Sequence, residues 1–300
     1  MNVASAYPTT APSPLVEGEF SFTQADFARI AAMLYEQAGI TLSESKSTLV
    51  YSRLAKRVRT LGLGGFSDYC DLLGRPDEAD ERGRMLNALT TNLTRFYREP
   101  HHFDHLRDQV LAPLVEKVRA GGRVRIWSAG CSSGQEPFSI ALTVLSLIPE
   151  AADLDVKVLA TDIDSNMIAQ GQAAIYSDEM IEPIPQALRS RWLERDPDDR
   201  ARWRMAAAAR SLVAFKELNL MQSWPMNGPF HAIFCRNVVI YFDEPTQERI
   251  WSRFRPLLAP EGRLYIGHSE RLSGATGGYA SDGLTVYRAR HQTEDARASS

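Results

Sequence analysis

The sequence predicts an α/β protein in which a small all-helical domain precedes a larger domain built on a parallel sheet. Three observations predict this fold class. Apolar residues recur at helical spacing from Thr23 to about Leu89, with no alternating segment among them. From Val124 onward, strand-like and helical segments alternate, as is typical of a parallel sheet covered by helices on both faces. The alternation stops between Tyr176 and Asn219, which indicates an inserted subdomain.

We expect disordered tails at both ends of the chain. Residues 1–17 are rich in Pro, Thr, Ala and Ser, and residues 291–300 are polar and charged. Residues 18–89 then form the N-terminal helical domain. Its apolar positions fall into three helical stripes: Phe27, Ile30, Ala31 and Leu34; Val50, Leu54, Val58 and Leu61; and Tyr69, Leu72 and Leu73.

The larger domain is expected to span residues 90–290. Its strands are expected in VRIWSAG, VKVLATDI, HAIFCRN, RLYIGHS and LTVYRAR, and its helices in EPFSIALTVLSLI, SNMIAQGQAAI and EPTQERIWSRFRPLL. Within this domain, residues 176–219 are expected to form the insert. It is predicted to contain a helix in PQALRSRWLE, an acidic turn at Asp196-Pro197-Asp198-Asp199, and a hairpin made from ARWRMA and SLVAFKEL.

Composition favours a globular protein of the cytoplasm. Hydrophobic residues make up 44% of the chain, enough for a substantial core, and the net charge of −3 gives no overall attraction to nucleic acid or to an anionic membrane. The three cysteines lack CxxC spacing, so neither a disulfide framework nor a zinc site is expected. No signal-peptide pattern is present, and the longest apolar run, 138–149, is too short to span a bilayer, so no membrane insertion is expected.

Residues 130–134, GCSSG, fit two incompatible templates. As Gly-x-Ser-x-Gly they match the turn that presents a nucleophilic serine in α/β-hydrolases, and Asp243 and His268 follow later strands in the matching order. The position of this turn in the chain does not fit an α/β-hydrolase. The turn ends the first strand of its domain, whereas the hydrolase fold needs earlier strands to supply half of the oxyanion hole. The sequence also has no HGGG-like segment.

As a glycine-rich turn, the same residues predict nucleoside binding. Asp162 ends the second strand, where an acidic residue accepts hydrogen bonds from ribose hydroxyls. Phosphate recognition is disfavoured, because the glycine spacing differs from GxGxxG and Glu136 stands where helix amides would meet a pyrophosphate. The ligand is therefore expected to be a nucleoside without phosphates, of which S-adenosylmethionine is the common example.

Several motifs, taken together and in order, resemble one family: the chemotaxis receptor glutamate O-methyltransferases of the CheR type. The resemblance covers residues 90–270 and is carried by TxNxTxFYR at 90–98, His102-Phe103, WSAGCSSGQEP, ATDID at 160–164, Asn219-Leu220, FCRNVVIYFD at 234–243 and GHSE at 267–270. The departures are small: Tyr97 and Phe138 each replace one aromatic residue by another, and Gln135 stands where the family often has Glu.

The resemblance implies a class I, Rossmann-like methyltransferase fold with an N-terminal helical domain and an inserted β-subdomain. It implies that S-adenosylmethionine is bound by Asn92, Thr94, Arg98, Glu136, Asp162, Asn219, Leu220, Arg236 and Asn237. It places Arg98 and Tyr241 nearest the transferred methyl group, which passes to a receptor glutamate and leaves S-adenosylhomocysteine. A glutamate side chain, with a pKa of about 4.3, is already ionised at neutral pH, so no general base is required.

A cationic row follows the segment SKSTLVYSRLAKRVRTLG. On a helix, Lys46, Arg53 and Arg57 line up beside the buried stripe, with Lys56 and Arg59 extending the positive arc. A solvated face or a nucleic-acid contact would show the same pattern, although one short patch on an acidic protein is weak support for nucleic acid. By resemblance, this helix would meet the acidic methylation helices of a receptor.

Other signals are interpreted more plainly. Among His101, His102 and His105, the H-x-x-x-H spacing could place two imidazoles on one helical turn, but no HExxH glutamate and no third ligand accompany them, so no metal is expected. Cys131 and Cys235 are interpreted as core thiols. A nucleic-acid amino methyltransferase would carry an Asn-Pro-Pro-aromatic motif that this chain lacks, and a non-catalytic module remains the third alternative. We expect a monomer.

The sequence of the insert predicts whether the enzyme binds a receptor through the receptor's C-terminal peptide. Family members that bind a receptor's C-terminal peptide characteristically have glycines in the hairpin loop of this subdomain. Here no glycine lies between Gly171 and Gly228. The acidic turn would also repel a peptide carboxylate, so we expect an enzyme that uses no such tether.

Overall fold

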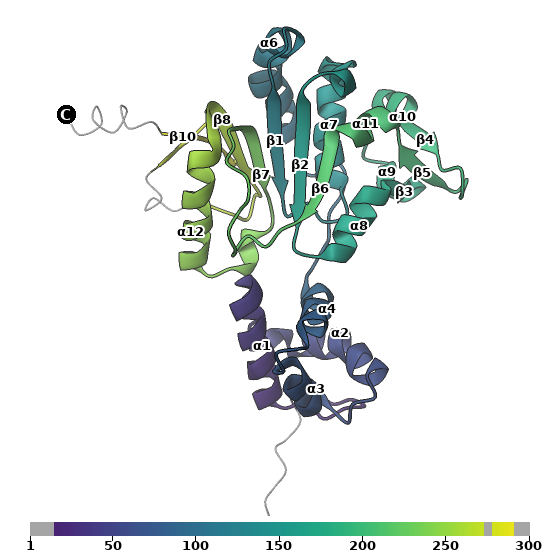
Figure 1. Ribbon diagram of the computed structural model, residues 1–300, viewed down its shortest axis with the longest axis vertical. Coiled ribbons are helices and arrows are strands. Elements are labelled where there is room, and N and C mark those ends of the chain that lie inside the picture. Colours follow the sequence, from purple (N-terminus) through teal and green to yellow (C-terminus); the bar gives the residue numbers. More distant parts are fainter. Residues whose placement is uncertain (1–14, 273–277, 291–300) are drawn as a thin grey trace, which may run out of the picture. The chain divides into compact units, whose positions relative to one another are not determined.

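The structure is a computed structural model that describes residues 15–272 and 278–290. The expected tail at 291–300 and most of the one at 1–17 lie outside the described residues. The chain divides into two compact units, Met1–Thr90 and Thr91–Ser300, whose elements are labelled in Figure 1. In the described ranges no helix has the length and apolar character needed to cross a membrane.

The first unit is helical, as expected, with α1 (Gln24–Ala38), a short 3-10 turn η1 (Glu44–Lys46), α2 (Ser47–Thr60), α3 (Phe66–Leu73) and α4 (Ala79–Leu89). A capping box begins α1: the Thr23 hydroxyl accepts the Asp26 N–H, and the Asp26 carboxylate accepts the Thr23 N–H. The helix ends at Gly39, whose φ of +70° favours glycine. The rings of Phe22 and Phe66, both fully buried, pack 4.4 Å apart.

The second unit contains a seven-stranded sheet in the order β6-β2-β1-β7-β8-β10-β9. The strands are β1 (Val124–Ala129), β2 (Val156–Asp162), β6 (Val213–Glu217), β7 (Phe230–Cys235), β8 (Leu258–Ile266), β9 (Tyr279–Ser281) and β10 (Val286–Ala289). The pairs among β6, β2, β1, β7 and β8 are parallel, and β10 runs antiparallel to both its neighbours. The predicted α/β fold with a parallel sheet is confirmed, and β9 is an additional strand.

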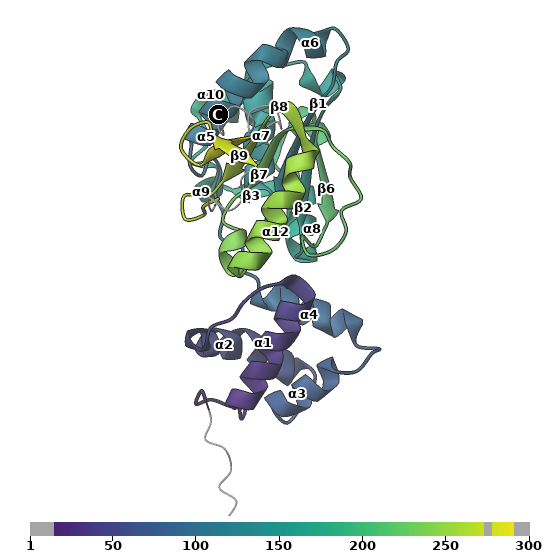
Figure 2. The same ribbon diagram turned by 90° about the vertical axis from the view of Figure 1, so that its left-hand side faces the viewer.

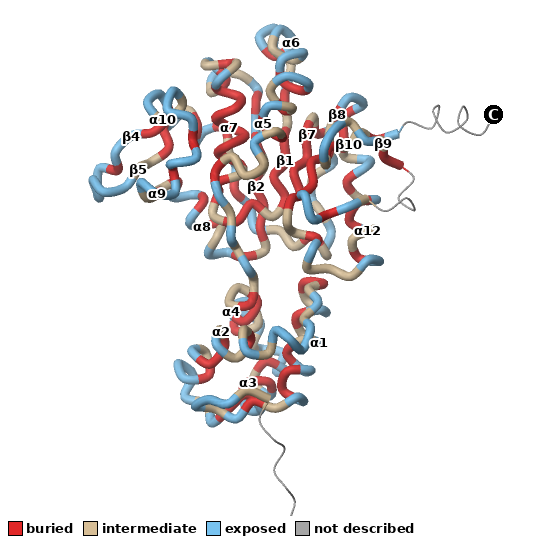
Figure 3. The backbone as a smooth tube through the Cα atoms, turned by 180° about the vertical axis from the view of Figure 1, so that it is seen from behind, coloured by how far each residue is buried: buried red, intermediate tan, exposed pale blue. Residues whose placement is uncertain are grey.

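Side chains of alternate strand residues enter two cores, one on each face of the sheet. Ile126 belongs to the core that includes Phe138 of α7, whereas its neighbour Trp127 belongs to the core that includes Trp251 and Phe254 of α12. Figure 2 shows α12 along one face of the sheet, and Figure 3 shows β1 and β7 as largely buried. The strands are therefore apolar on both faces.

Helices and turns surround this sheet. They are α5 (His101–His105), η2 (Leu106–Leu111), η3 (Ala112–Leu114), α6 (Val115–Arg119), α7 (Gln135–Leu147), η4 (Ala151–Asp153), α8 (Ser165–Ala173), α11 (Ala207–Leu212), η5 (Val239–Tyr241), α12 (Glu244–Phe254) and η6 (Arg255–Leu257).

The insert is present but shorter than expected. It holds β3 (Ile175–Ser177), α9 (Asp178–Ile181), α10 (Gln186–Trp192), β4 (Leu193–Arg195) and β5 (Arg202–Met205), and its strands form an antiparallel sheet in the order β3-β5-β4. The expected second hairpin strand, SLVAFKEL, is instead β6, which pairs in parallel with β2 at the edge of the main sheet. The hairpin is made by β4 and β5 around the acidic turn.

The register of the parallel strands places the carboxyl ends of several strands at one edge of the sheet. Ala129 of β1 lies beside Thr161 of β2, and Ser128 lies beside Phe234 of β7. The carboxyl ends of these strands therefore meet, together with the turns that follow them. In open α/β sheets, ligands bind in the crevice outside these ends.

Candidate active site

The glycine turn after β1 requires its glycines. Gly130 and Gly134 have φ of +80° and +97°. A Cβ on Gly130 would lie 2.3 Å from Cγ2 of Val238, and one on Gly134 would lie 2.8 Å from the Tyr176 hydroxyl. Between them, Ser132 is also left-handed, at φ +49°. The backbone of this turn therefore packs closely against its neighbours, and any side chain at Gly130 or Gly134 would force a shift.

Asp162, at the end of β2, holds the glycine turn. One carboxylate oxygen accepts the Ser132 N–H at 2.7 Å and the other accepts the Asp164 N–H at 3.0 Å. The residue is 8% exposed, and burial raises the pKa of its carboxyl group. The Asn92 amide donates to Asp164 at 2.8 Å, and the Ser132 hydroxyl donates to the Asn92 carbonyl at 2.9 Å. The structure thus brings together the predicted residues Asn92 and Asp162.

Arg236, just after β7, is a buried cation between two carboxylates. Its side chain is 2% exposed, with Nη1 3.4 Å from Glu136 and Nη2 3.6 Å from Glu99. It also donates to the backbone carbonyl of Arg98. Glu136, in the first turn of α7, accepts the Ser128 hydroxyl at 2.7 Å. Burial raises the pKa of Glu136, and the Arg236 charge opposes that rise.

Arg98 lies in a strained turn. The residues on either side of it, Tyr97 and Glu99, have φ of +50° and +58°, a conformation that side chains disfavour. The Arg98 guanidinium donates to the Leu93 carbonyl at 3.1 Å. Nδ1 of the exposed His268 lies 2.9 Å from Oε1 of Glu99. Neither Glu99 nor Glu270, which follows β8, was predicted from the sequence as a site residue. Glu99 directly follows the motif at 90–98, and Glu270 ends the GHSE motif, so both motifs could have pointed to them.

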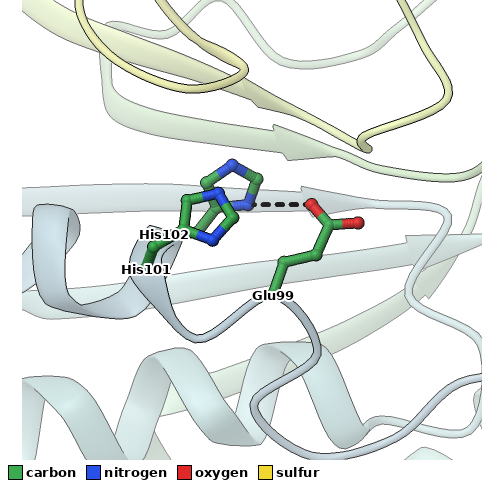
Figure 4. Close-up of side chains that lie close together, drawn as sticks. All are labelled: Glu99, His101 and His102. Carbon is green, nitrogen blue, oxygen red and sulfur yellow. Dashed lines mark ion pairs between the residues drawn. The ribbon is translucent and has the colours of Figure 1, made fainter.

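Figure 4 shows a cluster with metal-ligand chemistry, made of Glu99, His101 and His102. One ligand atom of each lies within 4.8 Å of the others. The Arg236 guanidinium, however, is 3.6 Å from Oε2 of Glu99, and that oxygen is also 3.5 Å from Nδ1 of His102. Burial, together with the Arg236 charge, lowers the pKa of His102 to about 3, so this histidine is neutral. A dication would stand beside a permanent cation, and a metal-free site stays our prediction.

The remaining predicted cofactor residues lie in the same unit. Thr94 is half-buried in the loop that joins Asn92 to Arg98. Asn219 follows β6, and its side-chain oxygen accepts the Met221 N–H at 2.9 Å. Leu220 is 7% exposed, and its carbonyl accepts from Arg253 at 2.6 Å.

Asn237 and Tyr241 lie in the turn after β7, where Tyr241 ends η5 and Asn237 has φ +59°. Most predicted residues of the site therefore lie in the turns that follow β1, β2, β6 and β7. Asn92, Thr94 and Arg98 instead lie in the loop that precedes α5.

The residues of the hydrolase alternative have separate partners. The Ser132 hydroxyl donates to Asn92, Asp243 caps α12 by accepting the Thr246 N–H, and His268 pairs with Glu99. Ser132 therefore lacks the histidine contact that activates a serine nucleophile. Burial also raises the pKa of Cys131 and of Cys235, so neither thiol is poised as a thiolate.

The cationic row runs from Lys46, the last residue of η1, along α2, and two of its three predicted receptor contacts also have partners within the first unit. Contact with a receptor stays a prediction. Lys46 is exposed. Arg53 donates to the carbonyl of Leu89 at 3.0 Å, near the end of α4. Arg57 pairs with Glu81, which is 3% exposed, through an Nε to Oε1 bond of 2.9 Å. Sequence spacing showed the row, but not the buried carboxylate that faces it.

Comparison with known proteins matches both units to family models. Residues 92–287 match the model described as CheR methyltransferase, SAM binding domain, and residues 25–90 match CheR methyltransferase, all-alpha domain. A probable chemotaxis protein methyltransferase of Rhizobium etli is 54% identical over 258 residues, covering 85% of this chain and 96% of that protein. Chemotaxis protein methyltransferase 2 of Pseudomonas aeruginosa is 43% identical, covering 93% and 99%. The chemotaxis protein methyltransferase of Escherichia coli is 39% identical, covering 89% and 91%.

Proposed function

The chain belongs to the CheR family of chemotaxis protein methyltransferases and uses S-adenosylmethionine; from that premise we propose that it methylates glutamate side chains of chemotaxis receptors. The products are glutamate methyl esters and S-adenosylhomocysteine. The observation that carries the proposal is the chain of contacts from Glu136, whose side chain is 12% exposed, through Arg236 to Arg98, at the carboxyl edge of the strands, where open α/β sheets bind ligands.

The residues present fit the nucleoside part of the cofactor. The Asp162 carboxylate accepts the backbone N–H groups of Ser132 and Asp164, and the several lone-pair positions of a carboxylate leave room for a further donor. Those free positions suit the hydroxyls of a ribose. The glycine turn beside it offers close backbone approach, and the absence of a basic phosphate-binding residue in that turn agrees with a ligand that has no phosphate.

The residues also fit the amino-acid part of the cofactor. Burial raises the pKa of the Glu136 carboxyl group despite the Arg236 charge, and a ligand ammonium beside it would favour its ionised form. Arg98 offers a planar fork of donors that matches a carboxylate. We assign Asn92, Thr94, Asn219, Leu220, Arg236 and Asn237 to the walls of the same pocket.

The proposed reaction is a displacement at carbon. S-adenosylmethionine supplies a methyl group on a sulfonium; a glutamate oxygen forms the new C–O bond as the C–S bond breaks. The glutamate is ionised at neutral pH, so no proton has to be removed. The protein's part is alignment, for which Arg98 and Tyr241 are the assigned residues. Alignment of two reactants contributes up to about 7 to 11 kcal/mol in well-oriented systems.

The receptor surface is proposed to include α2. Lys46, just before α2, and Lys56 on α2 are exposed and can meet an acidic methylation helix of the receptor. Arg53 and Arg57 hold α2 to the rest of the first unit. We propose that the protein acts as a monomer in the cytoplasm, on the cytoplasmic helices of the receptor. We propose no nucleic-acid substrate.

The test is transfer of a labelled methyl group from S-adenosylmethionine to a receptor cytoplasmic fragment. Incorporated label should be released by mild base, as methyl esters are, and should disappear from a fragment whose methylated glutamates are changed to glutamine. Arg98→Ala should abolish incorporation. Base-stable label, or label that survives the glutamate changes, would show a different substrate.

A further inference from the structure

Glu270, just after β8, has a carboxylate that gathers four backbone N–H groups. Oε1 accepts from Val238 at 2.9 Å and from Val239 at 3.0 Å, and Oε2 accepts from Asn237 at 2.9 Å and from Gly267 at 2.6 Å. The residue is 3% exposed. Three successive amides converging on one anion form the kind of concavity that binds anions in proteins. Here the anion is a side chain of the protein itself.

The turn that Glu270 holds is tightly constrained. Asn237 adopts φ +59°, which costs energy for a residue with a side chain. On one side, a Cβ on Gly267 would lie 2.6 Å from the Asn237 side-chain nitrogen. On the other side, Val238 packs against Gly130 of the glycine turn, with no room for a Cβ there. The carboxylate thus joins the end of β8 to the turn after β7.

This turn carries Arg236, Asn237 and Tyr241, three of the residues assigned above to cofactor binding and methyl transfer. We infer that Glu270 is a positioning residue for methyl transfer, which keeps Asn237 and Tyr241 in place through the backbone of residues 237–239. The inference rests on the proposed placement of those two side chains. It does not depend on which protein side chain receives the methyl group.

The substitution Glu270→Gln tests this with little change of shape. Its amide keeps one acceptor oxygen and replaces the other by an NH2 donor, which then faces N–H groups. Two of the four amides would lose their acceptor. The matched control is Glu261→Gln on β8, the strand that Glu270 follows, because Glu261 is 92% exposed and its contact with Arg263 spans 3.9 Å.

For Glu270→Gln we expect at least a tenfold fall in kcat and a severalfold weaker dissociation constant for S-adenosylhomocysteine, measured by calorimetry. Glu261→Gln should change neither. Tyr241→Phe should lower kcat more in the wild-type enzyme than in Glu270→Gln, because Tyr241 is already displaced in Glu270→Gln and contributes less to catalysis there. A purely structural Glu270 would lower the melting temperature and leave kcat, cofactor affinity and this non-additivity unaffected; that outcome would overturn the inference.

A second variant covers the case in which Glu270→Gln does not fold. Gly267→Ala leaves the Glu270 carboxylate intact and would place a Cβ 2.6 Å from the Asn237 side-chain nitrogen, so Asn237 has to shift. It should reproduce the kinetic and binding defects, and unchanged constants in a folded Gly267→Ala protein would refute the inference. Loss of glutamate specificity with intact cofactor binding would instead count against the proposed substrate, so the two failures are distinguishable.

Discussion

Replacing Asp162 by alanine should weaken cofactor binding without unfolding the protein. The carboxylate is 8% exposed and accepts the N–H groups of Ser132 and Asp164. Its remaining lone pairs are the proposed acceptors for the ribose hydroxyls. A lost hydrogen bond to a charged acceptor costs about 1 to 3 kcal/mol. The dissociation constant should therefore rise about 5- to 150-fold, at 1.4 kcal/mol per factor of ten.

Calorimetric titration of S-adenosylhomocysteine measures this directly. The matched control is Asp155→Ala at the other end of β2, where Asp155 is half-exposed and forms a 2.6 Å pair with Arg125. A surface pair of this kind contributes about 0 to 1 kcal/mol to stability, and its loss should leave cofactor affinity unchanged. If Asp162→Ala lowers the melting temperature but binds the ligand normally, Asp162 only holds the glycine turn and its assignment to the ribose is wrong.

Four further predictions follow from the structure. Ser132→Ala should keep most methyl transfer, and a fluorophosphonate should not label the wild-type protein; stoichiometric labelling would restore the hydrolase interpretation. Arg57→Met should lower the free energy of unfolding in urea by about 3 kcal/mol, because buried Glu81 loses its bidentate partner and keeps only a 3.5 Å contact with the exposed Arg84 and the Tyr69 hydroxyl. Lys46→Ala should leave stability unchanged and raise the KM for receptor in a salt-sensitive way, and equal stability losses would contradict this assignment. The pKa of His102 is lowered to about 3 in the folded protein, against about 6.5 in the unfolded chain, so the unfolded state binds the proton first as pH falls. The free energy of unfolding should therefore fall between pH 6.5 and pH 3, by up to about 1.4 kcal/mol per pH unit. His102→Gln should flatten this pH dependence in denaturant unfolding, and parallel slopes for the two proteins would count against it. Deleting the last residues of the receptor should leave the methylation rate nearly unchanged, because the insert has no glycine between Gly171 and Gly228 and the aspartates of its turn already pair with Arg202 and Arg204. Saturable micromolar binding of the isolated peptide would contradict this prediction.

The sequence by itself determined the fold class, and it indicated the edge of the sheet at which we propose the cofactor site. Hydrophobic period is a local property, so the change from helical spacing before Leu89 to alternating strands and helices after Val124 was sufficient to predict a parallel sheet. Parallel strands end at one edge, so Asp162 and the glycine turn were expected to meet there, and a 2.7 Å hydrogen bond joins them. These inferences needed only residues next to strand ends.

Only the tertiary structure decided which distant residues pair. The run 213–217 has the same character whether it closes a hairpin or lies beside β2, so its place at the sheet edge could not come from its own sequence. The same holds for charges: Arg57 meets Glu81 on another helix, and Glu270 meets amides about thirty residues earlier in the chain. Burial and charge pairing depend on packing between elements, and a linear pattern records only the spacing within one element.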